Sequence, residues 1–160
     1  MAIHLVANLH FDGISARQAQ AHGFADCRDM ARRICETWRT RVAPEDTVWI
    51  LGNVGNPVHL AGLPGRKHLV RGHLDPPAWN CLSTRRYESV CEGRFIETPG
   101  GVFYLSSEFE SAPEETRVIY GRSRRPSPEG HLCVSAERIG WGPVSLEAIL
   151  QSSAEVRQAA

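Results

Sequence analysis

Three short apolar segments of the sequence each run into a polar loop, and this repeated arrangement restricts the possible folds most. The segments 3–7, 47–51 and 67–71 lead into the loops Asn8–Gly13, Gly52-Asn53 and Gly72–Asp75. Apolar runs of this length that contain β-branched residues and end in Gly, Asn or Asp predict buried strands. The carboxyl ends of strands line the ligand crevice of an open α/β sheet, so we expect the three loops to converge in space.

The segments between and after these strands predict an α/β (α+β) domain. Apolar residues recur at helical spacing from about Asp26 to Val42, with charged residues between them, which predicts an amphipathic helix. Further strands are expected at 101–105, 117–120 and 131–134, and a helix is expected to start near 143–147, with Ser145 as its N-cap. From the length of 160 residues we expect one domain over 1–150, followed by a frayed polar tail over 151–160.

The composition disfavours several classes of protein. A formal net charge of zero argues against general nucleic-acid binding, which depends on an excess of Lys and Arg that neutralises phosphates. The five cysteines are odd in number and never form C-x-x-C, which predicts reduced thiols. The N-terminal segment lacks a basic region, and no window holds the ~18 apolar residues of a membrane-spanning helix. We therefore expect a cytoplasmic protein that does not bind a membrane.

Five short motifs occur in order along the chain. They are Asn8-Leu9-His10, Gly52-Asn53, Gly72-His73-Leu74-Asp75, a position near Ser106 or Ser107, and Gly121-Arg122-Ser123-Arg124. Together with the segments 63–72 and 141–147, their order and spacing resemble the calcineurin-like metallophosphoesterases of the small phage and bacterial type. The resemblance covers about residues 3 to 150. It implies a metallophosphoesterase-like sandwich of two mixed β-sheets flanked by helices.

The residues that carry the chemistry of that family are mostly replaced in this chain. The family's D-x-H and G-D motifs, which supply metal-binding carboxylates, read Asn8-Leu9-His10 and Gly52-Asn53 here. Leu74 occupies the position of the proton-donating histidine, and Arg122 and Arg124 replace two imidazole ligands. Paired divalent ions need anionic bridging ligands, and like unit charges 4 Å apart repel by about 4 kcal/mol at an effective dielectric constant near 20. We therefore expect no catalytic residue, no metal and no other cofactor.

The same replacements predict a positively charged cleft, because two carboxylates are lost and two guanidinium groups are gained. We hypothesise a pseudoenzyme that binds a phosphate-type anion, such as a phosphorylated small ligand, or an unknown protein partner. The residues expected in the cleft are Asn8, His10, Asn53, Arg71, His73, Asp75, Arg122 and Arg124. Asp75 is expected to anchor its loop by accepting backbone N–H bonds.

Structural interpretations of the arginines stay open. In one, Arg122 and Arg124 fill the former metal cavity and pair with Asp75, Asp12 or another carboxylate. In another, the run 122–128 forms a flexible basic loop that contacts an acidic partner. Neither interpretation requires a ligand in the cleft.

In two further interpretations, the protein catalyses a reaction or binds a nucleic acid. A weak phosphoesterase or phosphodiesterase would hold one divalent metal, Mn or Zn, on His10 and His73. A nucleic-acid-binding module descended from a nuclease would show steeply salt-dependent retention on DNA. The sequence does not choose the biological ligand.

Overall fold

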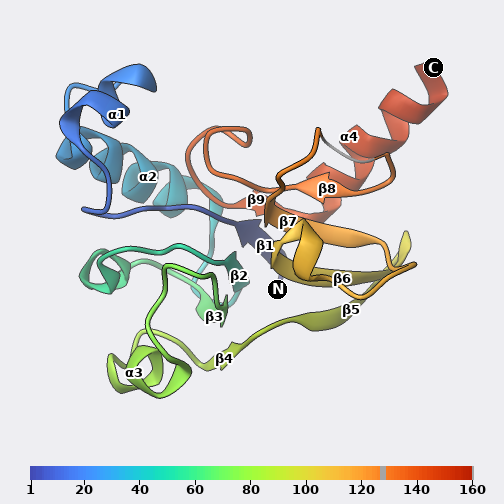
Figure 1. Ribbon diagram of the computed structural model, residues 1–160, viewed down its shortest axis with the longest axis horizontal. Helices are drawn as coiled ribbons and strands as arrows, with labels where there is room; N and C mark the ends of the chain where they lie inside the picture. Colours follow the sequence, from blue (N-terminus) through green and yellow to red (C-terminus); the bar gives the residue numbers. More distant parts are fainter. Residues whose placement is uncertain (127–128, 160) are drawn as a thin grey trace.

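The chain forms two β-sheets with helices around them (Figure 1). The computed structural model describes residues 1–126 and 129–159, with side chains described up to residue 152. Ser127 and Pro128, which end the basic run 122–128, lie outside the described residues, as does Ala160. Within the described ranges, no helix combines the length and apolar character needed to cross a bilayer.

The first sheet contains the three strands expected from the N-terminal half. Its order is β4-β3-β2-β1-β9, formed by β1 (Ile3–Val6), β2 (Thr47–Leu51), β3 (Arg66–Val70), β4 (Ser89–Cys91) and β9 (Val144–Ser145). Strands β1 to β4 pair in parallel, and β9 pairs antiparallel with β1. The carboxyl ends of β1, β2 and β3 therefore meet at one edge of the sheet, and their polar loops start there.

The second sheet is built from the strands of the C-terminal half. Its order is β5-β6-β7-β8, formed by β5 (Arg94–Thr98), β6 (Gly101–Glu108), β7 (Val118–Arg122) and β8 (Leu132–Cys133). Strand β5 pairs antiparallel with β6, whereas β6, β7 and β8 pair in parallel. The predicted fold class is confirmed: the protein is α/β (α+β), with two mixed sheets flanked by helices.

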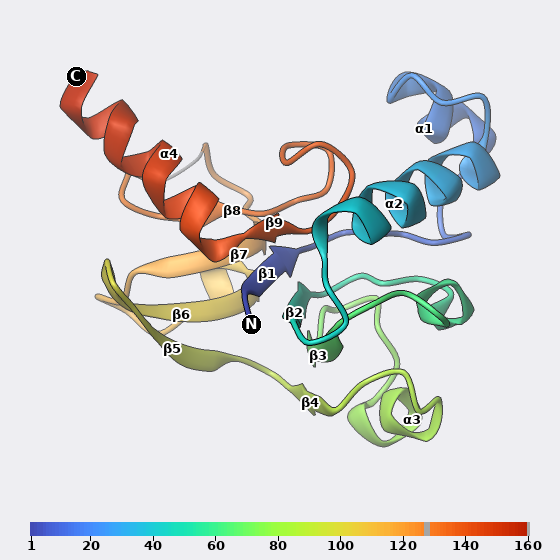
Figure 2. The ribbon, with the colours of Figure 1, turned by 180° about the vertical axis from the view of Figure 1, so that it is seen from behind.

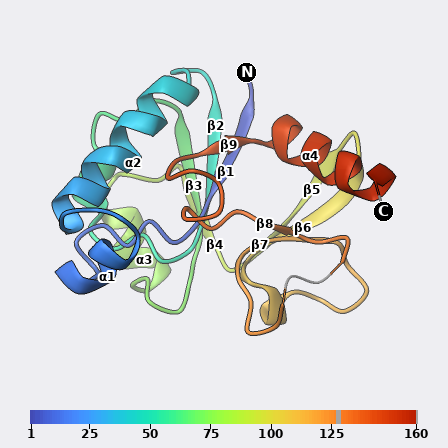
Figure 3. The same cartoon turned by 90° about the horizontal axis from the view of Figure 1, so that it is seen from above.

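The helices lie on both sides of the sheets. They are α1 (Ala16–Ala21), α2 (Cys27–Arg41), α3 (Ala78–Ser83) and α4 (Leu146–Ala159), with the 3-10 turns η1 (Pro57–Leu60) and η2 (Phe109–Ser111). Figure 3 shows α1 and α2 on the side of the first sheet and α4 on the opposite side of the molecule. Helix α2 forms because Asp26 caps it by accepting from Asp29 N, and because Met30, Ile34 and Trp38 give it one buried face.

Two hydrophobic clusters hold these layers together. One lies between α2 and the first sheet, and it contains Trp38, Val6 and Ile50. The other contains Leu5 and Leu51 of the first sheet together with Phe103, Leu105 and Ile119 of the second sheet. Successive strand residues point to opposite faces, so neighbours such as Leu5 and Val6 enter different clusters. The first sheet is therefore buried on both faces, and its strand ends are rigidly placed.

The C-terminal segment differs from the expectation. Residues 151–159, expected as a frayed tail, continue helix α4 up to Ala159. The predicted helix start is confirmed, because Ser145 Oγ accepts from Ala148 N at 3.2 Å. In the view from behind, α4 and its C-terminal end lie far from α3 and β4 (Figure 2).

Candidate functional site

The loops that follow β1 and β2 converge with the end of β7, as the sequence predicted. Asn8 follows β1, and its Nδ2 donates to Gly121 O at 2.8 Å across the gap between the two sheets. Asn53 follows β2, and its Nδ2 donates to Asn8 Oδ1 at 2.9 Å. The loop after β3 joins them, because Leu74 N donates to Asn53 Oδ1 at 3.3 Å. Four strand ends from two sheets thus meet at one place.

Unusual backbone geometry accompanies this convergence. Asn8, His10 and Asn53 have φ values of 56°, 45° and 56°, in the left-handed region that few residues other than glycine and asparagine adopt. Gly52 has φ 81°, and a Cβ atom there would lie 2.7 Å from Ser107 Cβ and 2.9 Å from Gly72 Cα. Only glycine allows the loops to approach so closely. Such clustering of left-handed residues is typical of functional sites.

Asp75 holds the first-sheet loops in place. Its carboxylate is buried and accepts from Asn53 N and Gly72 N at 2.8 Å each through Oδ2, and from Val54 N at 2.8 Å through Oδ1. The bonds from Asn53 and Val54 join the loop after β3 to the loop after β2, and the bond from Gly72 closes the loop after β3. Asp75 therefore has the anchoring role expected from the sequence, and its oxygen atoms are directed at the backbone.

The amides at positions 8 and 53 are likewise engaged within the protein. Asn8 Nδ2 donates to Ser135 Oγ at 2.9 Å in addition to Gly121 O, and Asn8 Oδ1 accepts from Asn53. Asn53 is almost fully buried, and its Oδ1 accepts from Leu74 N. At the two positions where the resemblance implies carboxylates, the side chains bond to each other and to the loops.

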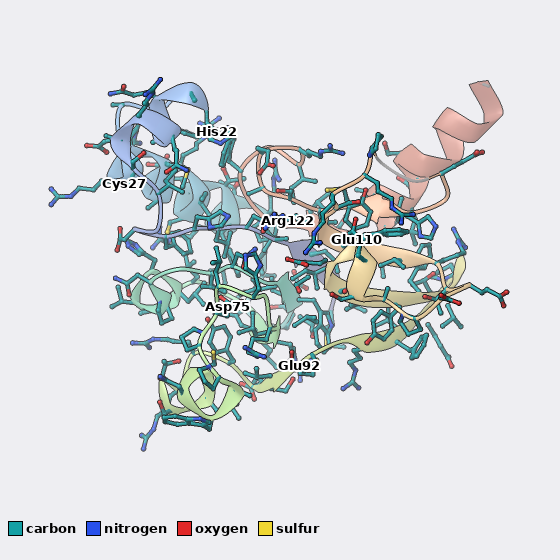
Figure 4. All side chains as sticks on the ribbon, viewed as in Figure 1. His22, Cys27, Asp75, Glu92, Glu110 and Arg122 are labelled. Atoms are coloured by element: carbon teal, nitrogen blue, oxygen red, sulfur yellow. The ribbon has the colours of Figure 1, made fainter. Side chains whose placement is uncertain are left out.

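A second group of polar side chains lies at the end of β6 and β7. His73 Nδ1 is 2.9 Å from Glu108 Oε1, and Arg122 Nη1 is 3.5 Å from His73 Nε2 and 3.9 Å from Glu108 Oε1. With a proton on Nδ1, the His73 ring donates to Glu108, and its Nε2 accepts from Arg122. Arg122 is half exposed and points from β7 toward the centre of the molecule (Figure 4). Arg122 thus pairs with a carboxylate, as one of the open interpretations expected, and the partner is Glu108.

Two residues of the predicted cleft face elsewhere. Arg71 forms a two-point ion pair with Glu92, with Nε to Oε1 at 2.7 Å and Nη2 to Oε2 at 3.2 Å. The hydrogen bonds that Arg71 donates to the Glu92 carboxylate raise the pKa of Arg71 above its ordinary value. Arg124 is held through its backbone N, which donates to Glu110 Oε1 at 2.8 Å. Neither arginine lines the cavity described next, although both were expected in the cleft.

The converging loops enclose a cavity of about 490 Å³, which lies within the usual size range of ligand pockets. Of the predicted residues, those that line it are Asn8, His10, Asn53, Leu74 and Arg122. His73 contacts Arg122 at its margin, and Asp75 lies beneath it. The sequence did not indicate Ser135, Glu137 and Arg138, which follow β8 and line the cavity. Arg125, from the basic run 122–128, also lines it. The same signal, a polar stretch after a strand, is present at 135–138.

The cavity carries an excess of positive charge. Of the described residues that line it, Arg122, Arg125 and Arg138 are cationic and Glu137 is anionic, which gives three positive charges against one negative charge. Burial lowers the pKa of His10 below its ordinary value, although Glu137 and Asp75 oppose the shift. His10 therefore contributes a neutral imidazole at neutral pH. The site thus combines guanidinium donors with a floor of neutral polar groups, formed by Asn8 and Asn53.

The donor set does not fit a bridged pair of metal ions. Across the described parts of the chain, no group of three or more His, Cys, Asp and Glu side chains is arranged to hold a metal ion. Asn8 and Asn53 supply neutral amides that already bond to each other, and Asp75 directs both oxygens at backbone N–H groups. Bridging two divalent ions requires anionic oxygen atoms that these positions do not offer.

One solved structure resembles this fold over nearly its whole length. It is the crystal structure of a protein of unknown function, AQ665 from Aquifex aeolicus, with a TM-score of 0.70 and 18% sequence identity. The alignment covers 94% of this chain and 98% of that chain. At this identity the likeness shows the fold alone. No family model and no curated protein matches the sequence.

Proposed function

We propose that this protein is a catalytically degenerate, metallophosphoesterase-like protein that binds a phosphate-type anion in the cavity between its two sheets. The observation that carries the proposal is the lining of that cavity, where three arginines face one glutamate. Guanidinium groups match the geometry of phosphate oxygens and keep their charge at all accessible pH values. The sandwich arrangement implied by the family resemblance belongs to the same proposal.

Each part of the cavity has a separate role in this proposal. Arg122 and Arg125 supply charged donors from the loop after β7, and neutral His10 supplies a hydrogen-bonding group from the opposite wall. Asn8 and Asn53 keep the floor fixed, because their amides bond across the gap between the sheets. Rigid placement of the floor lowers the entropic cost of ordering a ligand.

Hydrolysis is not part of this proposal. Leu74, at the position where the family has its proton donor, is largely exposed at the cavity and has no ionisable group. The donor set beside it does not fit two metal ions, so no nucleophile is generated by that route. Binding without turnover is the function that the remaining groups support best.

The proposal is tested by calorimetric titration of the whole protein with inorganic phosphate and with sulfate. Arg122→Gln should weaken binding by about 10-fold or more, because it removes a charge-assisted hydrogen bond. Arg124→Gln is the matched control, since it deletes the same charge two residues away, outside the cavity, and should leave affinity nearly unchanged. Equal affinities for both variants and the unaltered protein would refute the cavity as the anion site.

A second assay separates binding from turnover. The purified protein is incubated with a generic phosphodiester in added Mn²⁺ or Zn²⁺, and hydrolysis is followed over time. We expect none above the rate without protein. Hydrolysis that disappears in His10→Ala would replace the proposal with a weak metal-dependent phosphoesterase.

A further inference from the structure

A second basic pocket lies at the other edge of the first sheet. It has a volume of about 460 Å³ and lies where β3 begins and where the chain leaves α3. Five of the nine described residues that line it are charged, and they are Arg66, Lys67, Arg85, Arg86 and Glu88. Four positive charges thus face one negative charge, which leaves a formal excess of three.

Among the described residues, Glu88 is the one carboxylate that lines this pocket, and none of the four cations forms an ion pair. Lys67 Nζ donates to Leu63 O at 2.6 Å and to Gly65 O at 2.9 Å, which are both neutral acceptors. Arg66 contacts only neutral groups through Nη2. In the part of the chain that the structure describes, neither Arg85 nor Arg86 forms an ion pair. The four cations therefore keep their capacity to bind an anion.

The cations also lie close enough to repel one another. Burial lowers the pKa of Lys67 below its ordinary value, and the positive charge of Arg86 lowers it further, against the opposing effect of Glu88. Arg85 has φ 55°, a left-handed conformation that glycine or asparagine adopts more readily than arginine. An anion between these side chains would relieve their mutual repulsion, because it would place negative charge where the positive potential is highest.

The pocket is separate from the cavity between the two sheets. Arg66 is the first residue of β3, whereas the loop at 71–75 follows the last residue of that strand. Five residues of β-strand span about 16 Å, so a small ligand at one end does not touch the other end. None of the residues that line this pocket lines the cavity described above.

We infer that this pocket is a second anion-binding site, which takes a ligand with two or more linked phosphate groups. The formal excess of three charges is spread over two segments, 66–67 and 85–86, and it exceeds the charge of about −1.5 to −2 that one phosphate group carries at pH 7. Two carbonyl oxygens fix the ammonium group of Lys67 in place. Together with the guanidinium groups, it supplies several hydrogen-bond donors for successive phosphates. Charged side chains dominate the lining, which favours a phosphate chain over an apolar ligand.

The test is a titration with inorganic tripolyphosphate at low ionic strength. It uses Arg122→Gln as the background, so that the cavity between the sheets contributes little. Adding Arg85→Gln and Arg86→Gln should weaken binding by about 10-fold or more, whereas adding Arg33→Gln and Arg39→Gln on the exposed face of α2 should change it less than about 2-fold. Equal loss in both sets would show a general charge effect and overturn the inference.

A measurement on the unaltered protein complements the variants. Backbone amide NMR shifts on adding tripolyphosphate should change most at 65–67 and 85–88. Tripolyphosphate binding with these shifts, but with no effect of Arg122→Gln on inorganic phosphate, would refute the cavity proposal and retain the second site. No shift at these residues at saturating tripolyphosphate would exclude the second site, whatever the cavity binds.

Discussion

The polar residues in the two walls of the central cavity differ in burial and in hydrogen bonding. On the first-sheet side, Asn53 and Asp75 are buried, with exposed fractions of 2% and 7%, and their hydrogen bonds end on backbone groups and on Asn8. On the second-sheet side, the Arg122 side chain is 50% exposed and reaches its partners only at 3.5 to 3.9 Å. The polar groups of one wall are hydrogen-bonded within the fold, whereas Arg122 on the other wall has only long contacts.

This difference explains how the site relates to the family that the sequence resembles. The positions that would carry metal-binding carboxylates lie on the first-sheet wall, and here they stabilise the loops instead. In our proposal, the positive charge that binds an anion comes from Arg122 at the end of β7, Arg125 in the loop after it and Arg138 after β8. Stability and ligand affinity should therefore respond to different substitutions, which the following predictions test.

The largest effect is expected at the first-sheet wall. Asp75→Ala leaves three backbone N–H groups buried without an acceptor, and it should lower the free energy of unfolding by about 3 kcal/mol or more. Denaturant unfolding followed by circular dichroism measures this loss. Asp12→Asn, which removes the charge of a partly exposed carboxylate and suits the positive φ of 57° there, should cost less than about 1 kcal/mol. Similar losses for both variants would contradict the anchoring role.

An intermediate effect is expected at the second-sheet wall. Glu108→Gln removes the negative charge 3.9 Å from Arg122, so it should strengthen phosphate binding by about 3-fold to 10-fold. Titration with inorganic phosphate measures the change. The free energy of unfolding should fall by only about 1 kcal/mol, since a partly exposed ion pair with His73 is lost. Weaker phosphate binding in this variant would show that Glu108 orients Arg122 for the ligand rather than competing for it.

The smallest effect is expected from pH at His10. Its folded-state pKa lies below the ordinary value of 6.5, so the unfolded chain binds the proton more readily. Stability from this group is therefore fully present above about pH 6.5 and is lost as the pH falls through the unfolded and then the folded pKa. Unfolding curves between pH 7.5 and about pH 5 should be less pH-dependent for His10→Gln than for the unaltered protein. An unchanged pH dependence would show that His10 is not desolvated.

Local pattern was sufficient to predict much of the scaffold. The strands before the three loops were predicted because each is an apolar run that ends in a polar loop, and helix α2 because its apolar residues recur at helical spacing. Helices α1 and α3, with six residues each, are too short to show a helical period, and β9, with two residues, is too short to form an apolar run. Asp75 was also predictable, since its bonds reach the backbone of its own and the adjoining loop.

The sequence by itself determined the two mixed sheets, the converging loops and the neutral amides at positions 8 and 53. Only the tertiary structure decided which arginines face the cavity. Arg71 pairs with Glu92, 21 residues away, and the Arg124 backbone N donates to Glu110. Neither residue lines the cavity, whereas Arg125, from the basic run 122–128, and Glu137, which no motif indicated, do line it. The direction of a long charged side chain depends on partners that are distant in sequence. Neither the hydrophobic period nor the spacing of motifs predicts these partners.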